Sequence, residues 1–310
     1  MTGAGPPGGS SRYVYPQFEA GLDLGYFRVA GAGIGNCLFA YFHAMLFAQR
    51  SGAMLIQPPW PSLKLGPLLR GERSKRFYIG LFRTAPVELS GLGKGIALAS
   101  ALAGPWRDAP IPSPASARTN GRLTVVRCRH HLFEPLLPDR EEIRRRFLEI
   151  ARPPLPLRQG WGNGRYIAVH VRLGDFAAAS PERLRSGAVN NLRIPLAWYV
   201  DVVRRLRAVF PHLPVQVLSD GAEPELAPLL AIEGVRIRRE DDDLSELAAL
   251  AGACLLVGSR STFSRWAAFF GNMPSIWLAT VAGTERCTTS DVPFLQVGAE
   301  TSVITADLLP

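Results

Sequence analysis

Residues 166–176 read YIAVHVRLGDF, a mainly apolar run that ends in a cluster of polar residues. The run does not alternate between apolar and polar positions, which is typical of a parallel strand covered on both faces. Similar short runs recur downstream, separated by helical patterns near 196–210, 223–231, 244–251 and 263–270. This alternation predicts a doubly wound α/β domain with further strands at 215–218, 235–237, 254–257 and 275–278.

The first half of the chain contains a glycine-rich loop between two apolar patterns. Residues 31–36 read GAGIGN, after an apolar run at 26–30 and before a helical pattern at 37–50 that Gly52 would end. With a short run at 53–57, these segments predict a strand-helix-strand unit.

The rest of the first half gives fewer signals. Residues 58–121 contain recurrent Pro, Gly and Ser, and 108–121 is expected to be an irregular loop. A strand is expected at 123–128. A helix is expected to begin at Asp139, with Glu142 in a capping box and a buried face formed by Ile143, Phe147 and Ile150.

Composition marks the boundaries between domains. Residues 1–20 are rich in Gly, Pro and Ser and predict a disordered tail. The segment PPLP at 153–156 and three glycines at 159–164 form the strongest candidate linker. We therefore expect an N-terminal domain at 21–158 and a C-terminal domain at 159–310.

The whole chain of 310 residues has a globular composition, with 47% hydrophobic and 20% charged residues. Its net charge of +9 comes almost entirely from arginines on amphipathic helices, which favours a solvated helix face over a nucleic-acid site. No secretion signal or metal-type cysteine pair is evident, and the apolar run at 96–103 is too short to cross a bilayer. We expect a cytoplasmic protein, and the basic charge leaves peripheral association with the inner membrane surface as an alternative.

Polar residues follow three of the expected strands. Because the carboxyl ends of parallel strands meet at one sheet edge, these residues should lie together. Hydroxyls that open a helix, together with an arginine, suit a nucleotide diphosphate. The alternatives are a simple helix cap for Ser261 and Thr262, an Asx-turn for Asp220, and an ion pair with Asp175 for Arg172. The residues after these strands are His170, Arg172, Gly174, Asp175, Ser219, Asp220, Ser259, Arg260, Ser261, Thr262 and Ser264.

Four segments resemble the motifs of the family 11 α-1,2-fucosyltransferases. These are GAGIGNCLF at 31–39, HVRLGDF at 170–176, VLSDG at 217–221 and GSRSTFSRWAA at 258–268. That family belongs to a wider group of GDP-fucose-dependent enzymes, which includes α-1,6- and protein O-fucosyltransferases. The resemblance runs in order over residues 27–278, although 58–121 matches no motif.

The resemblance implies a GT-B fold, in which two Rossmann-like domains face each other across a cleft. It implies that the second domain binds the GDP-sugar donor and the first binds a glycan acceptor. Arg172 would then hold the β-phosphate, with His170 and Asp220 near the guanosine. The remaining donor contacts are expected from Gly33, Gly35, Asn36, Ser219, Ser261, Thr262, Phe263 and Ser264.

Four positions depart from the family pattern. Cys37 replaces a Gln, Leu173 a second Arg, Gly221 a second acidic residue and Arg265 a Trp. Loss of the second Arg would remove one phosphate or guanine contact. Either Arg260 or Arg265 could replace it.

Together these features predict an inverting, metal-independent transferase that moves fucose from GDP-fucose to a glycan hydroxyl in α-1,2 linkage. No cofactor or nucleic acid is expected. Arg172 would neutralise the leaving diphosphate, and Asp175 or Glu182 would be the base. The alternatives are another GDP-sugar or linkage, or a non-catalytic nucleotide-sugar-binding protein.

Two rival chemistries fit the sequence less well. The loop GAGIGN is not GxGxxG, and no acidic residue follows the next expected strand, which disfavours NAD. Residues 241–243 read DDD, as in metal-binding transferases, but they directly precede an expected helix, where carboxylates act as caps.

Overall fold

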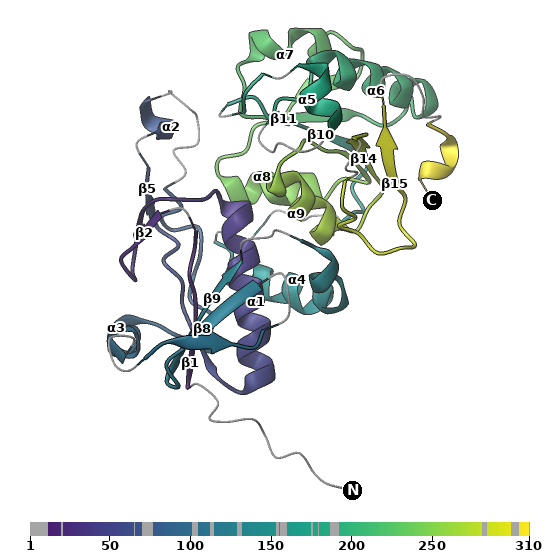
Figure 1. Cartoon of the computed structure of the whole chain (residues 1–310). Coiled ribbons are helices and arrows are strands. Elements are labelled where there is room, and N and C mark those ends of the chain that lie inside the picture. The colour runs from purple at the N-terminus through teal and green to yellow at the C-terminus, as the bar shows by residue number, and fades with distance from the viewer. Residues whose placement is uncertain are drawn as a thin grey trace, which may run out of the picture. The chain divides into compact units, whose positions relative to one another are not determined.

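The computed structural model describes residues 12–19, 21–64, 66–69, 77–100, 105–111, 115–128, 132–152, 155, 160–174, 176–178, 180–186, 192–280, 284–298 and 304–309. These form two compact units, and the chain passes from the first to the second after Arg152 (Figure 1). Leu69 and Leu137–Arg140 group with the second unit. Each unit is a Rossmann-like α/β structure on a mainly parallel sheet, which confirms the fold class predicted for a GT-B protein.

The second unit contains a six-stranded, fully parallel sheet in the order β12-β11-β10-β13-β14-β15. This order is that of dinucleotide-binding folds, in which the chain adds strands first on one side of the starting strand and then on the other. Five strands match the sequence prediction within one residue, and β15 was not expected. The strands are β10 (Ile167–Val171), β11 (Val215–Ser219), β12 (Val235–Ile237), β13 (Leu255–Val257), β14 (Ser275–Leu278) and β15 (Phe294–Val297).

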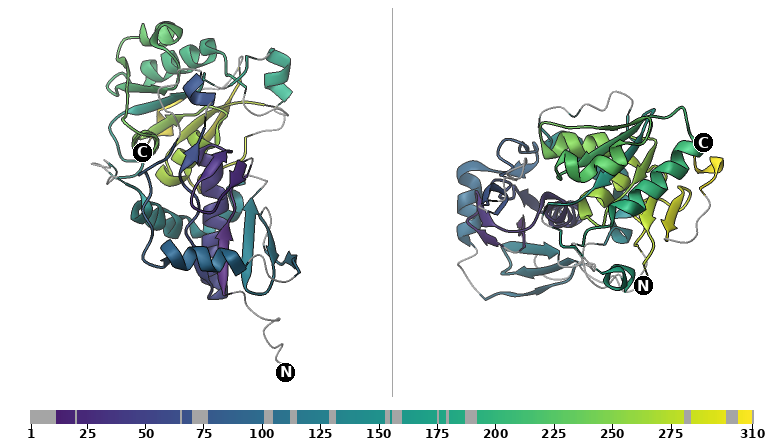
Figure 2. Two further views of the ribbon diagram at one scale, coloured as in Figure 1. Left: turned by 90° about the vertical axis from the view of Figure 1, so that its left-hand side faces the viewer. Right: turned by 90° about the horizontal axis from the view of Figure 1, so that it is seen from above.

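Helices cover both faces of this sheet (Figure 2). On one face, Trp198 and Val202 of α6 and Leu226 of α7 belong to the same buried cluster as Val169 and Val217. On the other face lie α8 and α9. The expected helices are found, and α5 and η3 were not predicted. Their bounds are α5 (Pro181–Ser186), α6 (Leu196–Val209), α7 (Glu223–Leu230), α8 (Asp243–Ala251), α9 (Thr262–Gly271) and η3 (Ala306–Leu308).

The sheet of the first unit has the order β6-β4-β1-β9-β8-β7, with β1, β4, β6 and β9 parallel. The last two strands, β8 and β7, are antiparallel. Helix α1 (Ile34–Ser51) is apolar on nearly all sides and is buried along most of its length, as expected for a helix that packs on a sheet. Gly52 ends it at φ 68°, as predicted. The parallel strands are β1 (Tyr13–Pro16), β4 (Met54–Ile56), β6 (Glu88–Leu89) and β9 (Leu123–Cys128).

The start of the first unit differs from the sequence prediction. Tyr13–Pro16, assigned to a disordered tail, is a central strand of the sheet, so that prediction is wrong for these residues. The expected strand at 26–30 is instead part of a separate three-stranded sheet. This small sheet contains β2 (Gly21–Asp23), β3 (Arg28–Ala30) and β5 (Ser62–Leu63).

The remaining elements of the first unit include several that the sequence did not predict. The expected loop at 108–121 largely forms the hairpin of β7 (Arg107–Ala109) and β8 (Ala115–Thr119). Helix α4 (Arg140–Ile150) buries Ile143, Phe147 and Ile150 as expected, after the 3-10 turn η2 (Glu134–Asp139). The other helices are α2 (Gly66–Leu69) and α3 (Gly91–Ala99). Among the helices in the described ranges, none is both long enough and apolar enough to cross a membrane.

Candidate functional site

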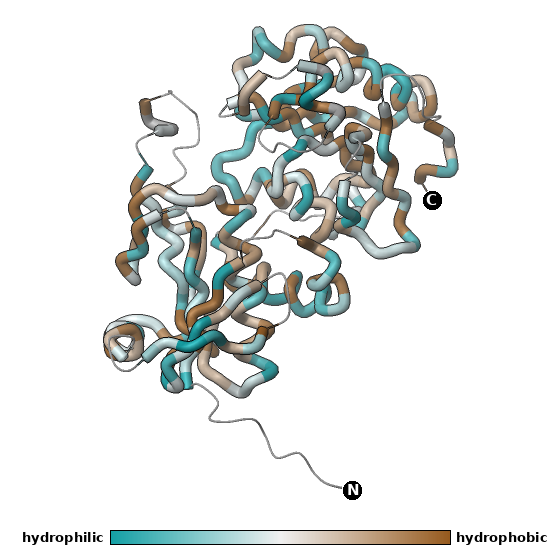
Figure 3. Tube along the Cα trace, viewed as in Figure 1, coloured by the Kyte–Doolittle hydropathy of each residue, from teal (hydrophilic) through white to brown (hydrophobic). Residues whose placement is uncertain are grey.

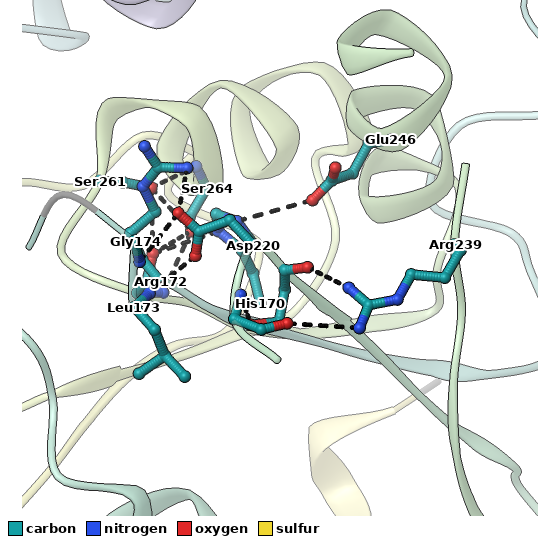
Figure 4. A network of polar contacts seen from close by, with 12 residues as sticks. His170, Arg172, Leu173, Gly174, Asp220, Arg239, Glu246, Ser261 and Ser264 are labelled. Carbon is teal, nitrogen blue, oxygen red and sulfur yellow. Dashed lines mark hydrogen bonds and ion pairs between the residues drawn. The ribbon is translucent and has the colours of Figure 1, made fainter. Parts of the chain in front are cut away.

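The candidate site lies where the strand order of the second unit reverses. Strands β10 and β13 are neighbours, but the chain continues from β10 toward β11 and from β13 toward β14. Ligands of open α/β sheets bind at this reversal, beyond the carboxyl ends of the strands. The two segments that leave the sheet there carry Arg172 and Ser261 (Figure 4).

Arg172 forms an ion pair with the carboxylate of Asp220. Arg172 Nη1 lies 2.8 Å from Asp220 Oδ2, and both side chains are largely buried. Asp220 also accepts hydrogen bonds from the backbone N–H groups of Leu173 (2.7 Å) and Gly174 (3.1 Å). The loop after β11 therefore fixes both the guanidinium and the turn after β10.

These contacts change the role predicted for Asp220. A carboxylate has about four acceptor positions, and Arg172, Leu173 and Gly174 supply donors to three of them. Asp220 is thus poorly placed to accept both hydrogens of a guanine edge. These bonds to Leu173 and Gly174 differ from an Asx-turn, and the alternative of an Arg172–Asp175 pair involves Asp175, which lies outside the described residues.

His170 is a buried, neutral histidine on the side of β10 that faces α9. Its Nδ1 lies 2.5 Å from Ser264 Oγ and 3.1 Å from Ser259 Oγ. Burial, reinforced by the charge of Arg172, lowers the pKa of His170 to about 3. The imidazole therefore holds the serine segment after β13 against β10 and carries no charge at neutral pH.

The serines after β13 bond mainly to one another. Ser261 caps α9 by accepting from the Ser264 N–H (3.2 Å), so the cap alternative describes it. Ser259 Oγ contacts the hydroxyls of Ser261 (3.0 Å) and Ser264 (2.8 Å), and Ser264 is fully buried. Thr262 is the first residue of α9, and the ring centroid of Phe263 lies 5.5 Å from that of His170.

Two residues of this site were missed by the sequence analysis. Glu246 of α8 is half-buried, with Oε1 3.9 Å from His170 Nε2, and burial raises its pKa to about 7, with Asp243 adding to the effect. Arg239 donates to the backbone carbonyls of Ser219 (2.6 Å) and Gly221 (3.3 Å), which stiffens the loop of Asp220. An acidic residue in the first turn of a capped helix was the one available sequence signal for Glu246.

Two of the departures from the family pattern lie in contact. A Cβ atom added at Gly221 would overlap Leu173 Cδ1 and lie 3.2 Å from Leu173 Cβ. Leu173 is buried and packs with the core of the unit. The Leu173 side chain thus occupies the space beside Gly221, so the two replacements are sterically matched.

The two arginines after β13 have partners of their own. Arg260 donates to the Leu184 carbonyl of α5 (3.1 Å), and Arg265 pairs with Glu285 (3.2 Å). Both line a cavity of about 90 Å³ next to Gly258 and Trp277. This cavity could hold only a small polar group.

Other predicted site residues are placed as follows. Glu182 is exposed on α5. Ser219 is buried, and its hydroxyl accepts from the Gly221 N–H (3.0 Å). In the first unit, Gly33 caps α1, while Gly35 and Asn36 lie in its first turn.

The acidic run at 241–243 forms a helix cap, as predicted. Asp242 Oδ1 accepts from the N–H groups of Leu244 (2.8 Å) and Ser245 (2.9 Å), and Oδ2 accepts from the Ser245 hydroxyl.

No family model matches this chain, and no curated protein matches it significantly. Among solved structures, the chain is similar to the NodZ α-1,6-fucosyltransferase co-crystallised with GDP, at 16% identity over 86% of this chain and 95% of that chain, with a TM-score of 0.48. It is also similar to fucosyltransferase NodZ from Bradyrhizobium, at 15% identity over 85% of this chain and 94% of that chain, again with a TM-score of 0.48. The apo-form of POFUT1 is similar at 11% identity over 88% of this chain and 99% of that chain, with a TM-score of 0.42.

Proposed function

We propose that this chain transfers fucose from GDP-fucose to a hydroxyl of a glycan acceptor, with inversion and in α-1,2 linkage. The proposal is carried by Arg172, whose guanidinium is held by Asp220 at the strand-order reversal of a nucleotide-binding type of sheet. The four motifs in order support fucose as the sugar.

The chemistry of the site suits departure of a diphosphate. As the bond to the anomeric carbon breaks, negative charge develops on the β-phosphate oxygens. The positive charge of Arg172 can meet this charge, and the start of α9 adds the positive end of a helix dipole. A fixed cation and oriented N–H groups stabilise this charge without a divalent ion.

We assign recognition of the guanine edge to Glu246 rather than to Asp220. The guanine N1–H and N2–H₂ groups together require a carboxylate with both oxygens available in one plane. Asp220 is engaged by Arg172 and two backbone donors, whereas Glu246 is half-buried beside His170. Uracil presents one such donor, so a carboxylate here favours guanine over uracil.

The base that deprotonates the acceptor is proposed to be Asp175 or Glu182. Glu182 is exposed on α5, and this helix is tied to the segment after β13 by the bond from Arg260 to Leu184. A carboxylate on this helix can receive the acceptor proton while remaining open to solvent.

A thermal-shift titration with GDP and UDP tests this proposal. GDP should stabilise the protein and UDP should not, and Glu246→Gln should remove about a tenfold or larger preference. Glu233→Gln, an exposed position in the same unit, serves as the matched control. Equal stabilisation by GDP and UDP in the wild type would contradict the donor assignment.

A donor hydrolysis assay separates an enzyme from a non-catalytic binding protein. Slow release of fucose from GDP-fucose, abolished by Arg172→Ala, is expected of a transferase. Binding of GDP-fucose without turnover, even with an offered set of glycan acceptors, would favour the non-catalytic alternative.

A further inference from the structure

The small sheet of the first unit exposes an apolar face. Leu22 of β2, Val29 of β3 and Leu63 of β5 are direct cross-strand neighbours, so their side chains share one face. They are 61%, 40% and 51% exposed. The neighbouring Arg28 and Ser62, which point the other way, are buried. This sheet therefore turns its polar side inward and its apolar side outward, the reverse of the usual pattern.

Helix α3 of the same unit (Figure 1) also exposes two apolar side chains. Leu92 and Ile96, one helical turn apart, are 88% and 75% exposed. The helix is fixed to the β2–β3 turn, because the Tyr26 hydroxyl donates to the Gly91 carbonyl (2.8 Å) and the Lys94 ammonium lies over the Tyr26 ring. We call the exposed side of the small sheet, formed by Leu22, Val29 and Leu63, the apolar face.

The apolar face belongs to the half of the chain that exposes apolar side chains. Within the described ranges, every exposed large apolar side chain lies at or before Leu148. Figure 3 shows brown, hydrophobic stretches on the β2–β3 hairpin. Contiguous exposed apolar residues of this kind mark interaction sites more often than isolated ones do.

The net charge of the protein is concentrated in the same half. Residues 1–152 contain 20 Lys and Arg against 10 Asp and Glu, whereas residues 153–310 contain 15 against 16. An apolar face on a basic unit is attracted to an anionic lipid surface. A second copy of the chain would bring like charges together, so self-association through this face is disfavoured.

We propose that the N-terminal unit docks on an anionic membrane surface through the apolar face. The side chains of Leu22, Val29 and Leu63 enter the boundary between headgroups and acyl chains. Tyr26 and Phe27, in the β2–β3 turn, are 50% and 40% exposed. Aromatic rings favour the same boundary between headgroups and acyl chains. The basic charge of the unit supplies long-range attraction, and no segment crosses the bilayer in this mode of binding. This proposal does not depend on the donor assignment.

Cosedimentation with vesicles tests the proposal. The wild type should bind phosphatidylcholine vesicles containing phosphatidylglycerol at least about tenfold more tightly than pure phosphatidylcholine vesicles, and the binding should weaken as salt is raised. The double variant Val29→Ser/Leu63→Ser should lose roughly tenfold or more of this binding, because two apolar side chains no longer enter the lipid.

Leu148→Ser is the matched control, since Leu148 on α4 is 40% exposed, like Val29, but lies outside the apolar face. It should bind vesicles within about twofold of the wild type. Melting temperature and GDP binding, measured on all three proteins, show whether the fold and the donor site are unchanged. Three outcomes would overturn the proposal: no vesicle binding by the wild type, unchanged binding by the double variant, or a wild-type oligomer that the double variant dissociates.

Discussion

At Arg172, the guanidinium is paired with Asp220, and we propose that the same group holds the leaving diphosphate. Nη1 is bonded to Asp220, so the rest of the planar group is held in a fixed orientation for a phosphate. We expect Arg172→Lys to reduce transfer by a factor of about 100 or more, equivalent to roughly 3 kcal/mol, because one ammonium cannot hold both partners in this geometry. The measurement is kcat for fucose transfer, with circular dichroism to confirm the fold.

The matched control for Arg172→Lys is Arg205→Lys. Arg205 pairs with Asp201 at 2.8 Å on the exposed side of α6, where such pairs contribute little. Its activity should equal that of the wild type. Near-normal turnover by Arg172→Lys would remove Arg172 from its role at the leaving group.

Glu246 should make GDP binding depend on pH. Its pKa is raised to about 7 by burial, so the carboxyl is protonated below this pH and cannot accept both guanine hydrogens. GDP affinity should therefore increase as pH rises from 6 to 8. Glu246→Gln should flatten this dependence in a calorimetric titration. A wild-type affinity that is constant over this range would show that Glu246 does not contact the base.

The Glu246 carboxyl also affects the stability of the fold, and this effect has the opposite dependence on pH. Because the folded-state pKa of Glu246 lies above the ordinary value of 4.5, the folded state holds its proton more tightly than the unfolded state. The associated stability is present at low pH and is lost as pH rises through about 7. Glu246 therefore opposes folding at the pH where its charge serves binding.

Sequence reasoning found the residues of the site that directly follow strands. Arg172 and Asp220 could be predicted because parallel strands end at one edge, and their position after an apolar run is visible in the sequence. Glu246 and Arg239 could not, because a helix on one face and a loop after β12 bring them to the site only in the folded structure. The sequence also does not show which hydrogen-bond donors will contact a carboxylate such as that of Asp220.

The loops after β10 and β11 are matched elements. Gly221→Ala should destabilise the protein because its new methyl group overlaps Leu173. Leu173→Ala should also destabilise it by removing a buried side chain. In the double variant the methyl group has space, so the two effects should couple by about 0.5–3 kcal/mol. Chemical denaturation of the four proteins measures this, and strictly additive effects would contradict the contact.

Asp242 should stabilise α8 as its N-cap. It should not serve catalysis as a metal ligand. Asp242→Ala removes two hydrogen bonds to backbone N–H groups and should cost about 1 kcal/mol in the free energy of unfolding. Transfer by the wild type and by this variant should persist in EDTA. Strict dependence on added manganese or magnesium would contradict the metal-independent mechanism.

At the level of elements, the sequence predicted the second unit far better than the first. Strands β10, β13 and β14 are buried on both faces, so each is a short apolar run that can be recognised. Strand β1 reads YVYP and follows a segment rich in Gly and Pro, which hides a central strand. The apolar run at 26–30 does contain a strand, β3, but this strand belongs to the small sheet and exposes Val29, so apolar character there does not indicate burial in the main sheet.

The second unit should fold and bind GDP as a separate fragment. All six strands of its sheet, together with Arg172, Asp220 and Glu246, lie between residues 153 and 310. We expect this fragment to unfold cooperatively and to be stabilised by GDP, although it should transfer no fucose because the acceptor side is assigned to the first unit. A fragment that does not unfold cooperatively, or that folds but ignores GDP, would contradict this assignment.

The pairing of β1 with β9 determines when the first unit can form during synthesis. Tyr13 pairs with Leu123, so the central strand waits for a neighbour made about 110 residues later. At ordinary ribosomal speeds this delay is on the order of ten seconds. During that time β1 can pair with β4 but leaves its other edge open to foreign strands. Nascent chains that stop before residue 123 should therefore be clients of ribosome-associated chaperones, whereas chains that extend past α4 should be released from them.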